Sequence, residues 1–219
     1  MAYSDFTLPD ALRSFGLTRQ DQAGLFAAAA PVSPSSILTA HLEESAEYAL
    51  RLNTEKARSE LLIMPILMEA RRQAHYQISV FSGASFIVDT AQRLAGFCDY
   101  LVSASPESLY LEAPVLAVVE AKNEAIVSGY GQCIAEMVAA KIFNERAGTP
   151  RTVIYGAVTT GDAWSFLQLS GQSVVMEDGY YYLDRIENIL GILLFMVRPN
   201  ALLENPEGRL AGTVTKHHE

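Results

Sequence analysis

The chain has 219 residues, of which half are hydrophobic and 19% are charged, so its composition predicts a globular protein and excludes a disordered one. Its formal net charge is −9, from 16 basic and 25 acidic residues, and its longest basic run is Arg71-Arg72. This charge argues against strong independent binding to duplex DNA, which usually depends on lysine and arginine contacts to phosphates. We expect one domain with a substantial core, or one domain with an appendage.

Sequence features that indicate a compartment favour the cytoplasm. The longest apolar run, residues 189–197, is far too short to span a bilayer, and the first residues lack the pattern of a secretory signal. The two cysteines, Cys98 and Cys133, cannot define a disulfide framework or a complete zinc site, and both lie in apolar segments. These features predict a cytoplasmic protein with two buried thiols and no membrane partner.

The chain divides into three predicted parts. Residues 1–53 are expected to form an N-terminal cover of helices and loops, with helical composition over residues 19–30 and again from Ser36 onward. Residues 54–200 carry the predicted core domain. Residues 201–219 form a polar C-terminal tail.

The core begins with a predicted helix over residues 54–73, along which apolar residues at helical spacing form one stripe. Pro65 lies inside this pattern and should kink the helix or divide it into two pieces. Glu60 lies beside the apolar stripe. Two interpretations of Glu60 stay open: a surface ion pair with Lys56, or a contribution to a functional site.

Three strands are predicted next, over residues 78–89, 97–103 and 115–119, and the first is interrupted at Ser82-Gly83. Asp99 lies near the middle of the second strand. The third strand is an apolar run that continues into Glu120-Ala121-Lys122. Together these strands predict the centre of a sheet.

The end of the third strand carries the candidate chemistry. Because side chains alternate along a strand, Glu120 and Lys122 should point to the same side, roughly 6.6 Å apart. If the second and third strands pair, Asp99 can meet Glu120 on one face. Two carboxylates beside an apolar core cost free energy unless they pair or bind a cation. Asp99, Glu120 and the Ala121 carbonyl would supply hard oxygen ligands suited to Mg²⁺ or Mn²⁺.

Lys122 also has two interpretations. It forms an ion pair with Glu120 or Glu124 at the strand end, or it stabilises charge that builds up on a scissile phosphate. Its place beside an apolar strand favours the second interpretation.

The remaining elements complete an alternating pattern: a helix over residues 129–146, a hairpin over 152–169, a strand over 173–183 and a helix over 186–197. In the first of these helices, Gln132 and Glu136 lie on one face, a turn apart. Gln132 is either a site residue or an ordinary polar residue of the first turn, and Glu136 is expected to be solvated. Gly129-x-Gly131 lacks the rest of a dinucleotide-binding fingerprint.

Asp99, a gap of twenty residues and then Glu120-x-Lys122 resemble the active-site signature of the PD-(D/E)XK nuclease superfamily, although Cys98 stands where the family has proline. Residues 56–67 resemble the family's first core helix, whose glutamate, here Glu60, often approaches the metal. Gln132 resembles a glutamine of the second core helix that orients groups at the site. The resemblance covers residues 54–170. It implies a mixed α/β sheet with a restriction-endonuclease-like αβββαβ core, here carrying an N-terminal helical extension.

The resemblance implies a metal-dependent endo- or exonuclease that hydrolyses DNA phosphodiester bonds. Its Mg²⁺ or Mn²⁺ would be held by Asp99, Glu120, the Ala121 carbonyl and Glu60, while Lys122 assists the attacking water and Gln132 completes the site. The alternative is a non-catalytic nuclease-fold scaffold, or a homodimeric interaction protein, with a vestigial site. The complete set of two acids and a lysine favours the nuclease. The acidic charge favours the scaffold, or a nuclease that a protein partner with positive charge recruits to DNA.

Overall fold

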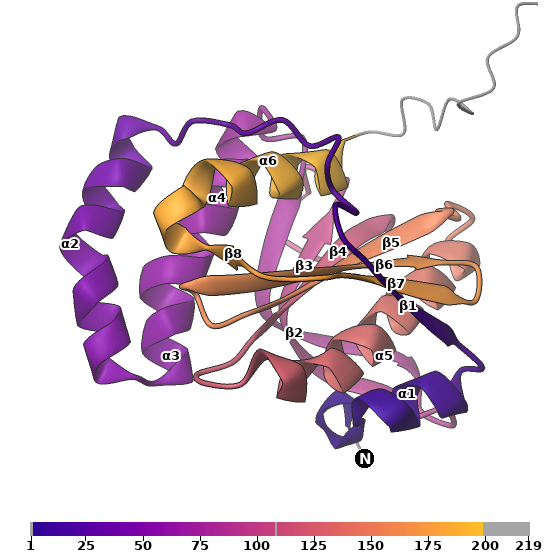
Figure 1. Cartoon of the computed structure of the whole chain (residues 1–219). Coiled ribbons are helices and arrows are strands. Elements are labelled where there is room, and N and C mark those ends of the chain that lie inside the picture. The colour runs from indigo at the N-terminus through magenta and orange to yellow at the C-terminus, as the bar shows by residue number, and fades with distance from the viewer. Residues whose placement is uncertain (1, 108, 199–219) are drawn as a thin grey trace, which may run out of the picture.

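The computed structural model describes residues 2–107 and 109–198, and it is built around one eight-stranded mixed sheet with helices on both faces (Figure 1). The strands are β1 (Thr18–Gln22), β2 (Ser79–Asp89), β3 (Leu94–Ser103), β4 (Val115–Ala121), β5 (Val153–Thr159), β6 (Ala163–Ser170), β7 (Ser173–Glu177) and β8 (Tyr181–Tyr182). The predicted mixed α/β class is confirmed. The tail predicted at residues 201–219 lies outside the described residues.

The helical elements precede β1, separate β1 from β2 and β4 from β5, and follow β8. They are η1 (Tyr3–Asp5), α1 (Leu8–Ser14), α2 (Ser36–Leu52), α3 (Glu55–Arg58), η2 (Ser59–Ile63), α4 (Met64–Gln73), α5 (Ile126–Arg146), η3 (Leu183–Arg185) and α6 (Ile186–Val197). Among the described residues, no helix combines the length and the apolar character needed to cross a membrane.

The sheet has the strand order β1-β7-β6-β5-β4-β3-β2, and β8 pairs with β6. β2, β3 and β4 form an antiparallel meander, and α5 then crosses over to place β5 parallel to β4. β5, β6 and β7 are again antiparallel. β4 and β5 therefore end at the same edge of the sheet, which is where the predicted site residues lie.

Two hydrophobic cores lie on opposite faces of the sheet. One core is covered by α5, with η1 and α1 packed on its outer side, and the other by α4 and α6, with α2 packed beside α3, η2 and α4 (Figure 1). β4 contributes to both cores, and all seven of its residues are buried. Asn144 of α5 fixes the start of this strand, since its side-chain amide accepts from the Val115 N–H at 2.7 Å and donates to the Val115 carbonyl at 2.8 Å.

The helix predicted over residues 54–73 is divided, as expected. Thr54 caps its first piece by accepting a hydrogen bond from the Ala57 N–H, and the π-helical turn η2 separates α3 from α4. Pro65 lies in the first turn of α4, which continues directly from η2, so its missing N–H cannot bond the Leu61 carbonyl four residues earlier. That carbonyl instead lies 2.8 Å from Nε2 of His41, and the division of the helix falls just before the proline.

The helix expected over residues 19–30 is wrong, because residues 18–22 form the edge strand β1, parallel to β7. Gly16 and Gly24 flank this strand with φ values of +62° and +71°, which set it off from its neighbours. All five residues of β1 are exposed. Their weak helical propensity is outweighed by backbone hydrogen bonds to the free edge of β7, a partner that lies 155 residues further along the chain.

Candidate functional site

Side chains normally alternate between the two faces of a strand. In β2 and in β3 this alternation shifts by one residue, at positions that lie side by side in the sheet. Val80 packs in the α4–α6 core, whereas Ala84 packs in the α5 core. In β3, Cys98 belongs to the α5 core and Tyr100 to the opposite one. Gly83, with φ +59°, and Asp99 lie at the two points of change, between the pairs Ser82↔Tyr100 and Ala84↔Cys98. An irregularity of this kind re-aims the side chain at the point of change, here that of Asp99.

Asp99 lies where β3 and β4 separate. The backbone ladder between these strands extends only to the pair Tyr100↔Val119. Beyond it, the Asp99 carboxylate accepts a hydrogen bond from the Ala121 N–H at 2.8 Å. A side-chain oxygen thus replaces the backbone acceptor and brings Asp99 beside the end of β4.

Glu120 and Lys122 lie on the same side of the chain, as predicted. The Lys122 ammonium donates to one carboxylate oxygen of Glu120, and the pair faces α5. Glu120 is only 1% exposed, and its second carboxylate oxygen is buried without a hydrogen-bond partner. A Cβ at Gly129 would lie 3.3 Å from both side chains and 2.6 Å from Val158, so the glycine lets α5 approach this closely.

Glu136 of α5 is a second buried carboxyl group, with an exposed fraction of 0%. The expectation that it is solvated is wrong, because α5 is covered by the sheet on one side and by η1 and α1 on the other. Gln132 donates to one oxygen of Glu136 at 3.1 Å, and the other oxygen has no hydrogen-bond partner. The structure therefore joins Gln132 to the site through Glu136.

The electrostatics of these acids follow from their burial. Burial, reinforced by the charges of Glu136 and Asp99, raises the pKa of Glu120 to about 10 and outweighs the opposing effect of Lys122. Burial also raises the pKa of Glu136 to about 8, although the Gln132 hydrogen bond acts in the opposite direction. Burial by itself lowers the pKa of Lys122, but the charge and hydrogen bond of Glu120 raise it overall. Without a cation, burial therefore favours the protonated form of both carboxyl groups, and Lys122 opposes this at Glu120.

Glu60 lies beside a pocket of about 390 Å³ that Asp99 also lines. The pocket is bounded by α3, η2, β2 and β3, and it connects Asp99 with solvent. Glu60 forms an ion pair with Lys56 at 2.8 Å, and both side chains are mainly exposed. The structure thus contains the surface pair and also places Glu60 on the same pocket as Asp99.

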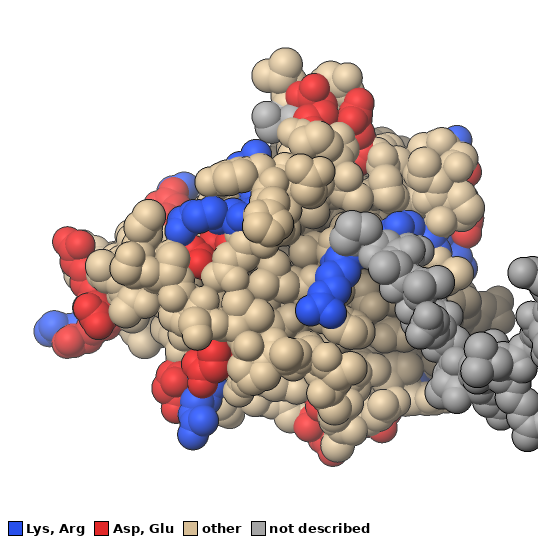
Figure 2. Space-filling model, turned by 90° about the horizontal axis from the view of Figure 1, so that it is seen from above, with Lys and Arg blue, Asp and Glu red and all other residues tan. Residues whose placement is uncertain are grey.

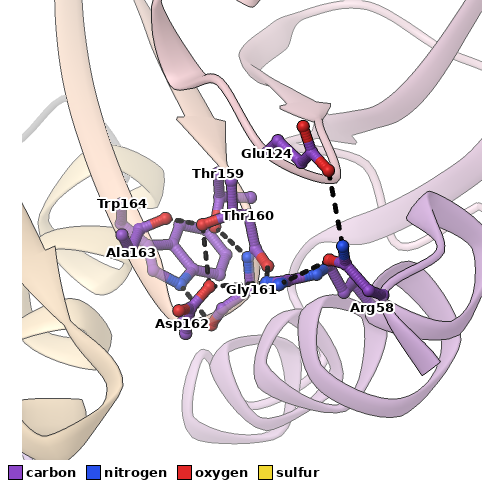
Figure 3. Close-up of polar contacts among 9 residues, drawn as sticks. Arg58, Glu124, Thr159, Thr160, Gly161, Asp162, Ala163 and Trp164 are labelled. Carbon is purple, nitrogen blue, oxygen red and sulfur yellow. Dashed lines mark hydrogen bonds and ion pairs between the residues drawn. The ribbon is translucent and has the colours of Figure 1, made fainter. Parts of the chain in front are cut away.

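The segment after Lys122 is fixed by a polar cluster around the β5–β6 turn (Figure 3). The Lys122 N–H donates to the Thr159 carbonyl at 2.8 Å. Arg58 reaches into the turn and donates to the Thr160 carbonyl and to the Asp162 carboxylate, both at 2.7 Å. The predicted hairpin therefore does more than reverse the chain, because it joins α3 to the end of β4 and supports the site.

The acidic residues of the site meet the requirements of a metal ion only in part. Within the part of the chain that the structure describes, no group of three or more His, Cys, Asp or Glu side chains is arranged to hold a metal. Mg²⁺ requires less than this, since it is commonly bound through one or two carboxylates together with water and substrate phosphate. Glu120, which has one unpaired oxygen, and Asp99, whose charge acts on Glu120, are two carboxyl groups that fit this smaller requirement.

Sequence reasoning missed Glu136 and gave Cys98 no role. The Cys98 thiol lies against Glu136, and burial together with this neighbour raises the pKa of the thiol. A signal for Glu136 was present, because residues 133–140 are apolar apart from this glutamate. A single acid within an apolar helical run indicates a buried carboxyl group.

Comparison with known proteins gives no relative from which a function can be transferred. No family model matches the chain, and neither a curated protein nor a solved structure matches it. Its interpretation therefore depends on the residues of the site.

Proposed function

We propose that this chain is a metal-dependent nuclease that hydrolyses phosphodiester bonds of DNA. The observation that carries the proposal is the carboxylate of Glu120, buried at the end of β4 with one oxygen on Lys122 and the other unpaired. Asp99 lies beside it, where β3 and β4 separate. The element order over residues 55–159, a divided helix, three strands, a helix and a strand, supports a restriction-endonuclease-like core.

In this proposal, the carboxylates of Asp99 and Glu120 and the carbonyl of Ala121 hold Mg²⁺ or Mn²⁺. Glu60 contributes from the pocket wall through an intervening water, because the three acids are not arranged to coordinate one ion directly. The bound cation would lower the pKa of a water molecule and neutralise phosphate oxygens. The Asp99–Ala121 hydrogen bond fixes the Asp99 carboxylate relative to Glu120. This positions the ligands before the substrate arrives, which reduces reorganisation during the reaction.

Lys122 supplies a positive charge that is not itself a ligand. Its ammonium group is held on the α5 side of β4 by Glu120, and its side chain is 20% exposed. From there it would donate a hydrogen bond to the attacking hydroxide or to a non-bridging phosphate oxygen. Gln132 acts less directly, because its amide donates to Glu136 and so orients a carboxyl group behind Glu120.

The charge of the chain affects how it would reach DNA. The face shown in Figure 2 carries separate Lys and Arg groups and no continuous basic area. With a net charge of −9, attraction to phosphates must come largely from the bound cation or from a partner protein. We therefore propose that a positively charged partner recruits this nuclease to its substrate.

The second candidate function is a scaffold that keeps the site without using it. The ion pair between Lys122 and Glu120 favours this alternative, because it partly compensates the buried carboxylate in the absence of a cation. A homodimer or another protein partner would then be the functional assembly.

The deciding experiment is a Mn²⁺-dependent cleavage assay on single-stranded and double-stranded DNA with wild type and Lys122→Met. The variant removes the charge and keeps most of the apolar stem, so we expect cleavage to fall about a hundredfold or more. Folding and metal affinity should change little. Lys141→Met is a matched control, since Lys141 of α5 donates to the Gly171 carbonyl and, among the described residues, to no group of the site.

Undiminished cleavage by Lys122→Met would rule out the assigned mechanism. Metal binding by the wild type without cleavage of either DNA would support the scaffold.

A further inference from the structure

A second pocket, of about 530 Å³, lies at the opposite end of the sheet from Glu120. It is bounded by the C-terminal ends of α4 and α6, the start of β5 and the residues that flank β2 and β3. Its apolar lining includes Ile78, Ala104 and Leu194. Its volume falls within the range of small-molecule sites, about 300–1,000 Å³.

The polar lining of this pocket is basic. Arg151 and Arg198 line it, and no Asp or Glu does. Neither guanidinium group has a hydrogen-bond or ion-pair partner among the described residues. Arg151 is partly buried, and this burial lowers the pKa of its guanidinium group. A partly desolvated cation without a carboxylate partner is costly, and an anion would offset that cost.

The partial negative charges at the C-terminal ends of two helices cancel only part of this positive charge. The C-terminal ends of α4 and α6 both face the pocket, and each carries a partial charge of about −0.5. The two guanidinium groups together carry +2, so the pocket retains a net positive charge. Arg151 precedes β5 and belongs to neither helix, so capping of a helix end does not explain its position.

The backbone at the pocket rim adopts an uncommon conformation. His75 and Tyr76, which follow α4, have φ values of +53° and +58°. One residue in the left-handed region often ends a helix, but a second consecutive non-glycine residue there adds free energy. The N–H groups of both residues bond the last turn of α4, which holds His75 at the rim.

We propose that this pocket binds a small amphipathic organic anion. Its carboxylate or phosphate head would contact Arg151 and Arg198, and its apolar body would pack on Ile78, Ala104 and Leu194. This pocket is independent of the proposed nuclease site. The pocket lies near the starts of β4 and β5, whereas the proposed nuclease site lies at their ends.

The test is a titration of the full chain with 8-anilinonaphthalene-1-sulfonate, which joins an aromatic body to an anionic head and fluoresces when bound in an apolar site. We expect saturable binding at one site. Arg151→Gln and Arg198→Gln should each weaken it about tenfold or more, as expected for the loss of a hydrogen bond to a charged group. Arg185→Gln is the matched control, because Arg185 is exposed and lies outside the pocket.

Displacement of the bound 8-anilinonaphthalene-1-sulfonate by other anions identifies the head group and the body of the ligand that the pocket prefers. Displacement by octanoate indicates an aliphatic carboxylate, and displacement by adenosine monophosphate indicates an aromatic phosphate. Ala104→Leu should reduce binding by filling the pocket while thermal unfolding stays cooperative. An absence of saturable binding, or equal affinity in Arg151→Gln, Arg198→Gln and Arg185→Gln, would overturn the proposal.

Discussion

Two of the regions in which this protein buries a carboxyl group treat that group in opposite ways. Glu69 of α4 has an exposed fraction of 0% and accepts four contacts: the Ser35 N–H at 3.0 Å, the Ser35 hydroxyl at 2.8 Å, the Gln73 amide at 2.7 Å and Arg72 at 2.8 Å. Glu136 of α5 is equally buried, yet it has one oxygen without a hydrogen-bond partner.

The pKa shifts follow this difference in hydrogen bonding. Burial acts to raise the pKa of Glu69, but the bonds from Gln73 and Ser35 lower it overall. At Glu120 and Glu136 burial prevails, and the pKa of each rises. A buried acid with all its bonds made holds the fold together, whereas a buried acid with an unpaired oxygen can still accept a proton or a cation.

The largest expected effect is loss of stability when Glu69 is truncated. Glu69→Ala leaves Arg72 and the Ser35 groups without their acceptor, so we expect a loss of about 3 kcal/mol, the scale for breaking a buried ion pair. This corresponds to a fall in Tm of roughly 6–12 °C for a chain of this size. Glu47→Ala, which removes an exposed glutamate, is the control in thermal unfolding. Equal Tm values for both variants would contradict the structural role of Glu69.

Metal binding should distinguish the two regions next. Calorimetry with Mn²⁺ should show binding to the wild type and a loss of about tenfold or more in Asp99→Ala and Glu120→Ala. Glu69→Gln is the control, because Glu69 lies outside the site and has no free oxygen. The same affinity in all four proteins would exclude Asp99 and Glu120 as ligands.

Glu136 should make the protein less stable as the pH rises. Between the pKa of the unfolded chain, about 4.3, and the folded pKa of about 8, only the folded state keeps the proton. The free energy of unfolding therefore falls across this range and levels off above it. Glu136→Gln removes this dependence, so the variant should match the wild type near pH 4 and be the more stable of the two at pH 8. Urea unfolding at both pH values measures the difference, and parallel pH profiles would disprove it.

Glu60 should show the smallest effect on stability. Its ion pair with Lys56 is exposed, so Glu60→Gln should leave Tm unchanged within error. If Glu60 also contributes to the metal site, the variant should bind Mn²⁺ more weakly than the wild type but better than Asp99→Ala. Unchanged Mn²⁺ affinity would leave Glu60 with the surface ion pair alone.

Much of the fold could be predicted because it depends on local patterns. The apolar run of β4, the hairpin around Gly161 and the helix α6 all appear where their periodicity and turn residues indicate. The shared side of Glu120 and Lys122 follows from strand alternation within three residues. Gln132 and Glu136 share a helix face for the same local reason.

The sequence by itself thus determined the element types at the centre of the chain and the pairs of site residues that lie within one element. Only the tertiary structure decided that residues 18–22 form a strand on β7, that α5 buries Glu136 between two layers, and that the Asp99 carboxylate occupies the gap between β3 and β4. The physical reason is the range of the interactions. Alternation and helical periodicity act over a few residues, whereas burial and strand pairing depend on partners more than twenty residues away, whose positions no local pattern specifies.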